Sequence, residues 1–168
     1  VLLRLDMNPV LAAPTGRAAK RLSQATGMPA KTIHRLLAYN PARGGFQRDE
    51  ENPLVADAVI LDETSMLDIP LFNSLINAIP MGTRLILVGD VDQLPSVGPG
   101  NFLNDAINAG VFKVVVLKEI FRQAEESLII KNAHRINQGL GPVYNVEGRG
   151  QKDFFFIEAK ETTQVLEQ

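Results

Sequence analysis

Residues 59–66 read VILDETSM, a run of bulky apolar residues that leads straight into two adjacent carboxylates. A short apolar run of this kind predicts a strand that is buried on both faces of a parallel sheet. Because burying charged carboxylates within such a strand would be costly, we expect Asp62 and Glu63 at its carboxyl end. In open α/β sheets this end faces the crevice in which ligands bind.

The acidic pair has two interpretations. In nucleoside triphosphatases, an Asp at this place helps to hold Mg²⁺, and a neighbouring acid orients or activates water. Alternatively, the strand is simply followed by an Asp that caps a helix, since Asp-Glu pairs are common in proteins. The rest of the chain has to decide between the two.

The composition is that of an ordinary globular domain. The 168 residues, of which 45% are hydrophobic and 21% charged, are enough for one domain with a core, together with part of a second. The net charge of -2 does not indicate nucleic-acid binding, so any such site must be a local patch. The chain begins at Val1 without Met, in what looks like an element already under way, and we expect it to be a piece of a longer protein.

The absence of cysteine excludes disulfides, thiolate metal sites and a Cys nucleophile. It fits a reducing compartment, and we expect a cytoplasmic location. No apolar run reaches membrane-spanning length and no signal peptide is visible, so we expect no membrane association.

Apolar runs and helical periodicities alternate along the chain. The runs predict strands at 9–13, 57–61, 84–88, 112–117 and 154–157. Helices are predicted from about 17 to 26, at 31–38, at 69–78, up to about 108, at about 126–137, and from 161 onward. Residues 40–53 predict a long loop or a loose hairpin around Gly44-Gly45. This alternation predicts βαβ crossovers and a doubly wound parallel α/β sheet.

Polar residues follow two further strands. Gly89-Asp90 leads to Gln93 after the strand at 84–88, and this cluster should converge with the acidic pair on one crevice. Gly-Asp is also a turn signal, but Gln is not a preferred turn residue, and its amide could sense a phosphate or a water. After the strand at 9–13, Thr15 is a plausible helix N-cap. This junction offers backbone N–H groups, a hydroxyl and cations to phosphates, although a solvated basic face is the more common explanation.

Several stretches together resemble the first motor domain of a superfamily 1 DNA helicase of the RecD type, the exodeoxyribonuclease V alpha-subunit family and its stand-alone relatives. In family order, they are LAAPTGRAAKRL at 11–22, TIHRLL at 32–37, LDETSM at 61–66, VGDVDQLPSVGPG at 88–100, EIFRQA at 119–124 and AHRIN at 133–137. An acidic pair alone is a weak signal, but ordered blocks over nearly the whole chain are highly specific.

The resemblance implies a DNA-binding role for residues of two blocks. Thr15, Gly16 and Arg17 match the motif that touches the backbone of single-stranded DNA. Thr32 and His34 match a second DNA-contacting block. A lone His in this setting is otherwise more often a surface residue than a ligand.

The resemblance also implies a nucleotide site. Asp62 matches the acid that coordinates Mg²⁺, and Glu63 matches the residue that activates the attacking water. Gln93 matches the residue that contacts the γ-phosphate and couples it to DNA movement, and Arg122 matches an arginine that reaches the γ-phosphate from the domain junction. Such an arginine is worth ~10³-fold or more in rate.

The family further implies a RecA-like P-loop NTPase fold, ATP and Mg²⁺ as cofactors, and 5′→3′ unwinding in recombination and repair. The implied partners are single-stranded DNA, duplex ends and, if the protein is not stand-alone, RecB- and RecC-like subunits. The run at 93–100 favours the stand-alone branch. We expect residues 1–140 to be a partial first motor domain, and 141–168 a linker with the start of the next.

One family motif is missing. The P-loop, G-x-x-x-x-G-K-[ST], does not occur, since no glycine of the chain is followed by Lys. The predicted sheet therefore lacks the P-loop strand. The alternative to an enzyme is a DNA-binding or scaffolding module with a degenerate NTPase fold. Retention of Asp62, Glu63, Gln93 and Arg122 favours the enzyme, and the absence of G-x-G-x-x-G argues against a Rossmann oxidoreductase.

We expect purified residues 1–168 alone to show no measurable ATP turnover, because the lysine and the amide cradle for the phosphates are absent. A phosphate-release assay with and without single-stranded DNA measures this. Robust DNA-stimulated hydrolysis would overturn the expectation.

Overall fold

The computed structural model describes residues 1–117, 127–144 and 153–155. The chain forms two compact units, Val1–Val114 and Val115–Gln168, and each is described by itself. None of the helices in these described ranges is both long and apolar enough to cross a membrane.

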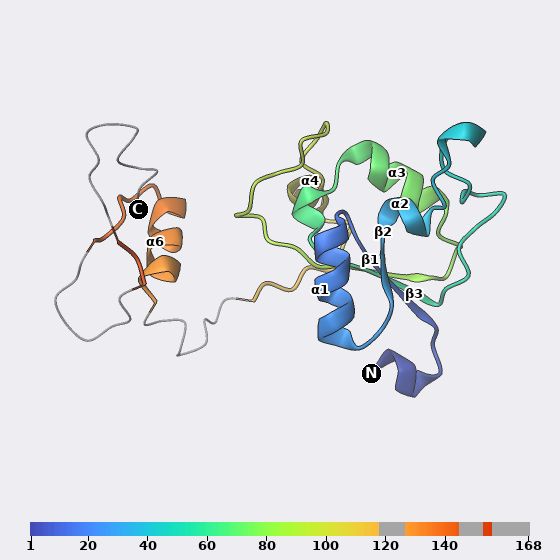
Figure 1. The fold of residues 1–168 in the computed structure, drawn as a ribbon, viewed down its shortest axis with the longest axis horizontal. Coiled ribbons are helices and arrows are strands. Elements are labelled where there is room, and N and C mark those ends of the chain that lie inside the picture. The colour runs from blue at the N-terminus through green and yellow to red at the C-terminus, as the bar shows by residue number, and fades with distance from the viewer. Residues whose placement is uncertain (118–126, 145–152, 156–168) are drawn as a thin grey trace, which may run out of the picture. The chain divides into compact units, whose positions relative to one another are not determined.

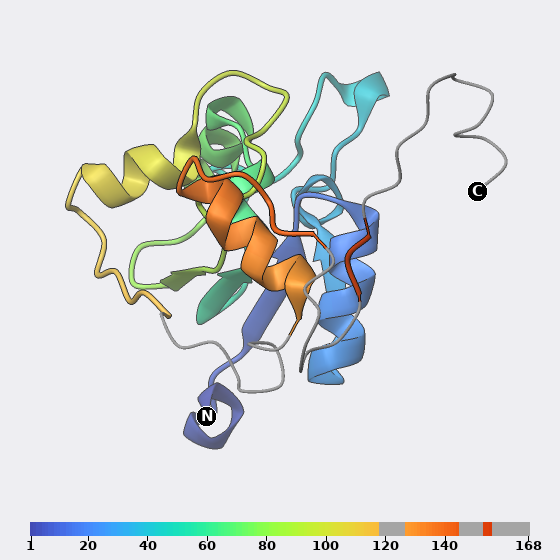
Figure 2. The same ribbon diagram turned by 90° about the vertical axis from the view of Figure 1, so that its left-hand side faces the viewer.

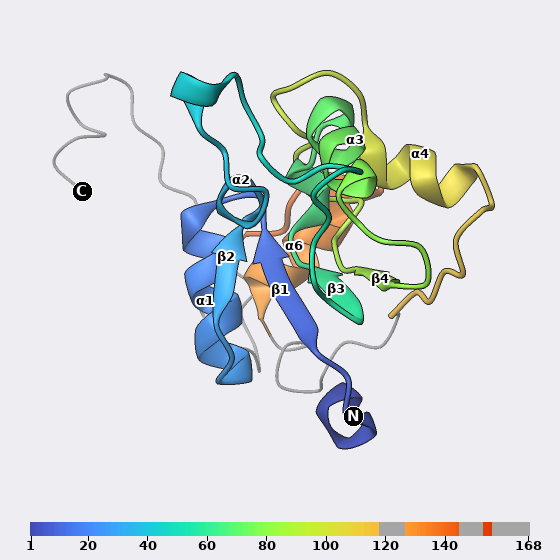
Figure 3. The ribbon, with the colours of Figure 1, turned by 90° about the vertical axis from the view of Figure 1, so that its right-hand side faces the viewer.

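Unit 1 is built on a four-stranded parallel sheet in the order β2-β1-β3-β4 (Figure 1 and Figure 3). The strands are β1 (Pro9–Ala13), β2 (Ala30–Thr32), β3 (Ala58–Leu61) and β4 (Arg84–Leu87). The predicted strands at 9–13, 57–61 and 84–88 are thus confirmed, together with the parallel sheet. β3, which carries the decisive apolar run, lies between β1 and β4.

Short helices precede, connect and follow these strands. They are η1 (Leu2–Leu5), α1 (Gly16–Thr26), α2 (Ile33–Leu36), η2 (Pro41–Arg43), η3 (Thr64–Met66), α3 (Ile69–Asn77) and α4 (Phe102–Asn108). The predicted caps of α1 are confirmed. Thr15 Oγ1 accepts a hydrogen bond from Ala18 N at 3.2 Å, and Gly27 ends the helix with φ 69°.

The main core lies on the face of the sheet to which Val59 and Leu61 of β3 contribute. Both are fully buried, and they pack with side chains from α2, α3 and α4. Burial of such a side chain stabilises the fold by roughly 1.5–3 kcal/mol. The rings of Phe72 and Phe102 join α3 to α4, with centroids 4.0 Å apart. A smaller cluster of Ala13, Ala18 and Ala19 lets α1 approach closely.

Two predictions about unit 1 are wrong in part. Residues 31–38 do not form one helix, because Lys31 and Thr32 belong to β2 and pair with Ala12 and Ala13. Pairing with the neighbouring strand overrides the helical pattern, which survives only as the short α2. The helix predicted at 69–78 is present but buried on one side only, since Ile69 and Ile76 are about 40% exposed.

The strand predicted at 112–117 is wrong as well. These residues form no strand, and Val114 to Leu117 are exposed. A β-strand is stabilised by hydrogen bonds to a neighbouring strand, and no described strand of this chain pairs with residues 112–117. Phe154 and Phe155 likewise lie outside any strand, while 119–124, 148–152, Phe156, Ile157 and the helix predicted from 161 fall outside the described residues.

Unit 2 contains α6 (Leu128–Asn137), the orange helix of Figure 2. Asp153 closes its start, accepting hydrogen bonds from Ser127 Oγ at 2.5 Å and Leu128 N at 2.9 Å. The Ser127 hydroxyl thereby holds the pKa of Asp153 below its usual range. Asn132 is the buried residue of α6, and its side chain exchanges two hydrogen bonds with the backbone of Val143.

The apolar residues of α6 are largely exposed, although a helical hydrophobic period would place them inside. Ile129 and Ile136 are more than half exposed, Ala133 is exposed and Leu128 is half-buried. Within unit 2, the covered side of α6 is therefore the side that carries Asn132. The apolar residues of the helix lie mostly outside that side.

Gly89→Ala should destabilise unit 1 by about 1–3 kcal/mol, because overpacking forces neighbours to shift. A Cβ at Gly89 would lie 2.5 Å from Thr64 Oγ1 and 2.9 Å from Leu103 Cδ2. Chemical denaturation measures the effect. Gly16→Ala is the matched control: it meets open space at the start of α1 and should leave stability equal or higher. Equal stability of the two variants would contradict the described packing.

Candidate functional site

The carboxyl ends of the four strands form one row. The register pairs Thr32 with Ala13, and Leu61 with both Ala12 and Leu87. Since neighbouring strands lie about 4.8 Å apart, the row from β2 to β4 is roughly 15 Å long. The residues that follow each strand therefore share one edge of the sheet, as the sequence predicted for the polar clusters.

This row has two halves. Thr15, Gly16 and Arg17 follow β1, and Thr32 and His34 lie at the end of β2, so the predicted DNA-binding residues occupy the β2–β1 half. Asp62, Glu63 and Gln93, which are predicted to bind nucleotide, follow β3 and β4 and occupy the other half. The Asp62 backbone N–H, which donates to Ala12 O at 3.0 Å, joins the halves.

Asp62 and Glu63 are half-buried and their geometry is fixed by the backbone. Asp62 Oδ1 accepts a hydrogen bond from Glu63 N at 3.0 Å, which leaves the second carboxylate oxygen for another partner. Glu63 has a left-handed backbone, with φ 55° and ψ 42°. For a residue with a side chain this conformation costs about 1–2 kcal/mol, and such strain is concentrated at functional sites.

The acidic pair fits Mg²⁺ rather than a metal held entirely by protein. Among the described residues, no group of three or more His, Asp or Glu side chains could hold a metal ion. Mg²⁺ is usually bound through one or two carboxylates and completes its octahedron with water and substrate phosphates. One half-buried carboxylate with a free oxygen is such a ligand set.

The turn after the acids is tied to the end of β4. Thr64, which is 1% exposed, donates to Val88 O from both its backbone N and its Oγ1, each at 3.0 Å. Val88 N in turn donates to Leu61 O at 2.8 Å. Gly89 follows in close contact with η3, where a side chain would not fit. The acidic pair and the Gly89 segment thus form one connected structure.

Gln93 lies in an exposed turn beyond Gly89. Its backbone N donates to Asp90 O at 3.3 Å, and Asp92 N donates to Asp90 Oδ1 at 3.0 Å. The far end of this segment is anchored on α3, because Ile69 N donates to Pro99 O at 3.2 Å. Gly98 also leaves no room for a side chain, since a Cβ there would collide with the Asp68 carboxylate.

In the other half, the two threonines cap helices. Thr15 Oγ1 accepts from Ala18 N, and Thr32 Oγ1 accepts from Arg35 N, each at 3.2 Å. Because a hydroxyl also carries a proton, both side chains can still donate to a phosphate oxygen. Arg17 and His34 are exposed beside them.

An aromatic cluster next to His34 was not predicted from the sequence. The rings of His34, Tyr39 and Phe46 lie 5.2–5.7 Å apart, and Tyr39 is 51% exposed. Between Tyr39 and Phe46, η2 forms a short turn that is closed by a single antiparallel bridge between Asn40 and Gly45. This turn is centred on residues 41–44 and not on Gly44-Gly45, where the hairpin alternative placed it. The predicted turn therefore did not bring Tyr39 and Phe46 together, although both directly flank the bridged pair.

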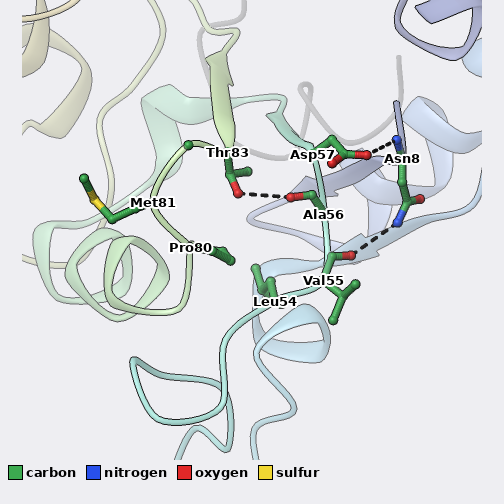
Figure 4. A pocket seen from close by; sticks show the side chains of 9 residues that line it. Asn8, Leu54, Val55, Ala56, Asp57, Pro80, Met81 and Thr83 are labelled. Atoms are coloured by element: carbon green, nitrogen blue, oxygen red, sulfur yellow. Dashed lines mark hydrogen bonds between the residues drawn. The ribbon is translucent and has the colours of Figure 1, made fainter. Parts of the chain in front are cut away.

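Arg122 falls outside the described residues. A shallow pocket of about 470 Å³ lies at the opposite, amino-terminal edge of the sheet (Figure 4). Its polar groups already bond to one another: Asn8 N donates to Asp57 Oδ2 at 2.7 Å, and Thr83 Oγ1 donates to Ala56 O at 3.0 Å. None of the predicted site residues lines this pocket.

A parallel sheet with an acidic pair at the end of a buried inner strand defines a nucleotide-binding type of α/β domain. Residues 2–99 match the family described as AAA domain, and the chain belongs to that family.

The similar curated proteins are DNA helicases. The chain is 42% identical over 140 residues to the ATP-dependent RecD2 DNA helicase of Deinococcus radiodurans, covering 83% of this chain and 19% of that protein. It is 33% identical over 161 residues to the RecBCD enzyme subunit RecD of Mycobacterium tuberculosis H37Rv, covering 85% of this chain and 26% of that one. The resemblance to RecD-type helicases is confirmed, and the chain spans about a fifth to a quarter of these relatives.

Among solved structures, the Pif1 helicase from Bacteroides in complex with ADP-AlF3 and single-stranded DNA is similar with a TM-score of 0.50. The identity is 24%, and the match covers 78% of this chain and 36% of that one. This likeness concerns the fold, and it confirms the predicted RecA-like α/β architecture.

Proposed function

We propose that this chain is part of an ATP-driven motor that translocates on single-stranded DNA and unwinds duplex ends. The observation that carries the proposal is the common edge of the sheet, on which the acidic pair and the two capping threonines follow neighbouring strands. The named relatives are helicases, and the solved structure of similar fold was obtained with a nucleotide analogue and single-stranded DNA.

In this proposal the β3–β4 half hydrolyses ATP. The free oxygen of Asp62 holds Mg²⁺, which neutralises charge on the phosphates when bound. Glu63 orients the attacking water and accepts its proton. The Gln93 amide contacts the γ-phosphate, and Arg122 stabilises the charge that develops on it.

The β2–β1 half binds the strand. Thr15, Gly16 and Arg17 offer a hydroxyl, a backbone N–H and a guanidinium to the phosphates, and Thr32 and His34 extend this contact. Such contacts are independent of sequence and sensitive to salt. The exposed ring of Tyr39 adds a surface on which a base can stack.

In this proposal, a short path of backbone couples the nucleotide half of the sheet edge to the DNA half. Asp62 is bonded to Ala12, and Thr15 lies three residues further along the same strand and turn. A change at the acidic pair therefore reaches the DNA half through backbone alone. We further propose 5′→3′ polarity, a role in recombination and repair, a cytoplasmic location and a motor-domain boundary near residue 140.

A second candidate is a binding module without hydrolysis, and a complete gene product without G-x-x-x-x-G-K-[ST] would support it. In that case the DNA half would remain in use and the acidic pair would not. Association with RecB- and RecC-like subunits suits either candidate and is tested by co-purification with them.

Glu63→Gln in the complete gene product should abolish ATP hydrolysis, by about 10²–10⁴-fold, while nucleotide binding persists. The amide keeps the size of the side chain but cannot accept the proton. Phosphate release and binding of a fluorescent ATP analogue are the two measurements. Glu51→Gln, an exposed loop position, is the matched control and should behave as wild type. Unchanged turnover in the Glu63 variant would refute its assignment as the base, whereas absence of turnover in the wild-type protein would favour the binding module.

Thr15→Asp should weaken binding of single-stranded DNA by more than about tenfold, because it places a negative charge beside the phosphates. Asp keeps the N-cap of α1, so thermal stability should be preserved, whereas Thr15→Ala would lose cap and hydroxyl together. Fluorescence anisotropy at several salt concentrations measures the affinity. Gln24→Glu introduces the same charge on the exposed side of α1 and should have little effect. Equal losses in both variants would count against a DNA role for Thr15.

A further inference from the structure

Ser65 is buried without a hydrogen bond. The residue is 6% exposed, and its Oγ is the buried side-chain nitrogen or oxygen that lacks a partner in the described part of the chain. A buried hydroxyl without a partner is unfavourable, because it has lost water and gained nothing in exchange. Such a group in a functional region calls for a physical reason.

The residues on either side of Ser65 already form hydrogen bonds. Thr64 uses both its backbone N and its hydroxyl on Val88 O, and η3 is closed by Met66 N, which donates to Glu63 O at 3.1 Å. The turn is therefore fixed from β4 on one side and from the acidic pair on the other. Ser65 cannot gain a partner by a small shift of its own backbone without breaking these bonds.

The connection that follows β4 packs against this turn. Gly89 packs against the turn so closely that a Cβ would lie 3.2 Å from Ser65 N. Immediately beyond Gly89, the exposed turn from Asp90 to Gln93 is held by a long backbone hydrogen bond of 3.3 Å. A hydroxyl can donate and accept at once, so it suits either a backbone group or an amide of this turn.

We propose that Ser65 is a positioning residue of the nucleotide site, whose hydroxyl bonds to the Asp90–Gln93 turn when nucleotide is bound. The bond ties the turn that carries Gln93 to the turn that carries Asp62 and Glu63. The inference rests on the proposed ATPase function and adds a residue that acts through Gln93 without touching the nucleotide.

This role predicts opposite effects on stability and on catalysis. Ser65→Ala removes an unpartnered hydroxyl, so the nucleotide-free protein should unfold at the same or a higher temperature. The same change should lower kcat of DNA-stimulated ATP hydrolysis by about tenfold with little change in KM, because the lost bond reaches its full strength only in the transition state for hydrolysis. If Ser65 had only a structural role, Ser65→Ala would lower the unfolding temperature and kcat together.

The experiment compares Ser65→Ala, Gln93→Ala and the double variant of the complete gene product. If Ser65 acts through Gln93, the double variant should be no slower than Gln93→Ala. Thermal unfolding is recorded without nucleotide and with ADP plus aluminium fluoride, and the gain in unfolding temperature with this analogue should be smaller for Ser65→Ala than for wild type. Ser74→Ala, which removes an exposed hydroxyl bonded to Pro70 O on α3, is the matched control.

Unchanged kcat in Ser65→Ala, additive losses in the double variant, or a lower unfolding temperature of the nucleotide-free variant would each overturn the inference while the proposed function stands. Absence of ATP hydrolysis in the wild-type protein would overturn the proposed function, and this inference with it.

Discussion

The burial of β3 constrains the rest of unit 1, since Ala58, Val59 and Leu61 are buried and Ile60 is half-buried. Val59 and Leu61 are inaccessible to solvent, and the strand pairs with β1 on one side and β4 on the other. No charged side chain can be placed within such a strand without a large desolvation cost. The carboxylates are therefore displaced to its end, where both neighbouring strands also end and a ligand can approach.

Much of this arrangement was predictable because it is local. The strands β1, β3 and β4 are marked by apolar runs, and the start and end of α1 by Thr15 and Gly27. Each of these signals has a physical cause within a few residues of the chain. The convergence of the polar clusters followed from parallel pairing alone.

What the sequence did not reveal depends on distant contacts. β2 is a strand because β1 offers it an edge, although its residues fit a helix. Residues 112–117 have a strong strand pattern but no described partner. The turn that carries the unpartnered hydroxyl of Ser65 packs against Gly89, which lies in another strand connection. Roles that came from the family resemblance, above all those of Gln93 and Arg122, remain predictions.

Both ends of the segment from Gly89 to Gly100 pack closely against other elements. Gly89 packs against η3, and Gly98 and Gly100 pack against the start of α3. A loop whose ends are already held has lost much of its conformational entropy before any ligand arrives. Ordering its exposed middle on a phosphate then costs less than ordering a free loop would. In the proposed ATPase, the close packing at these glycines would thus lower the conformational entropy that nucleotide binding must still remove.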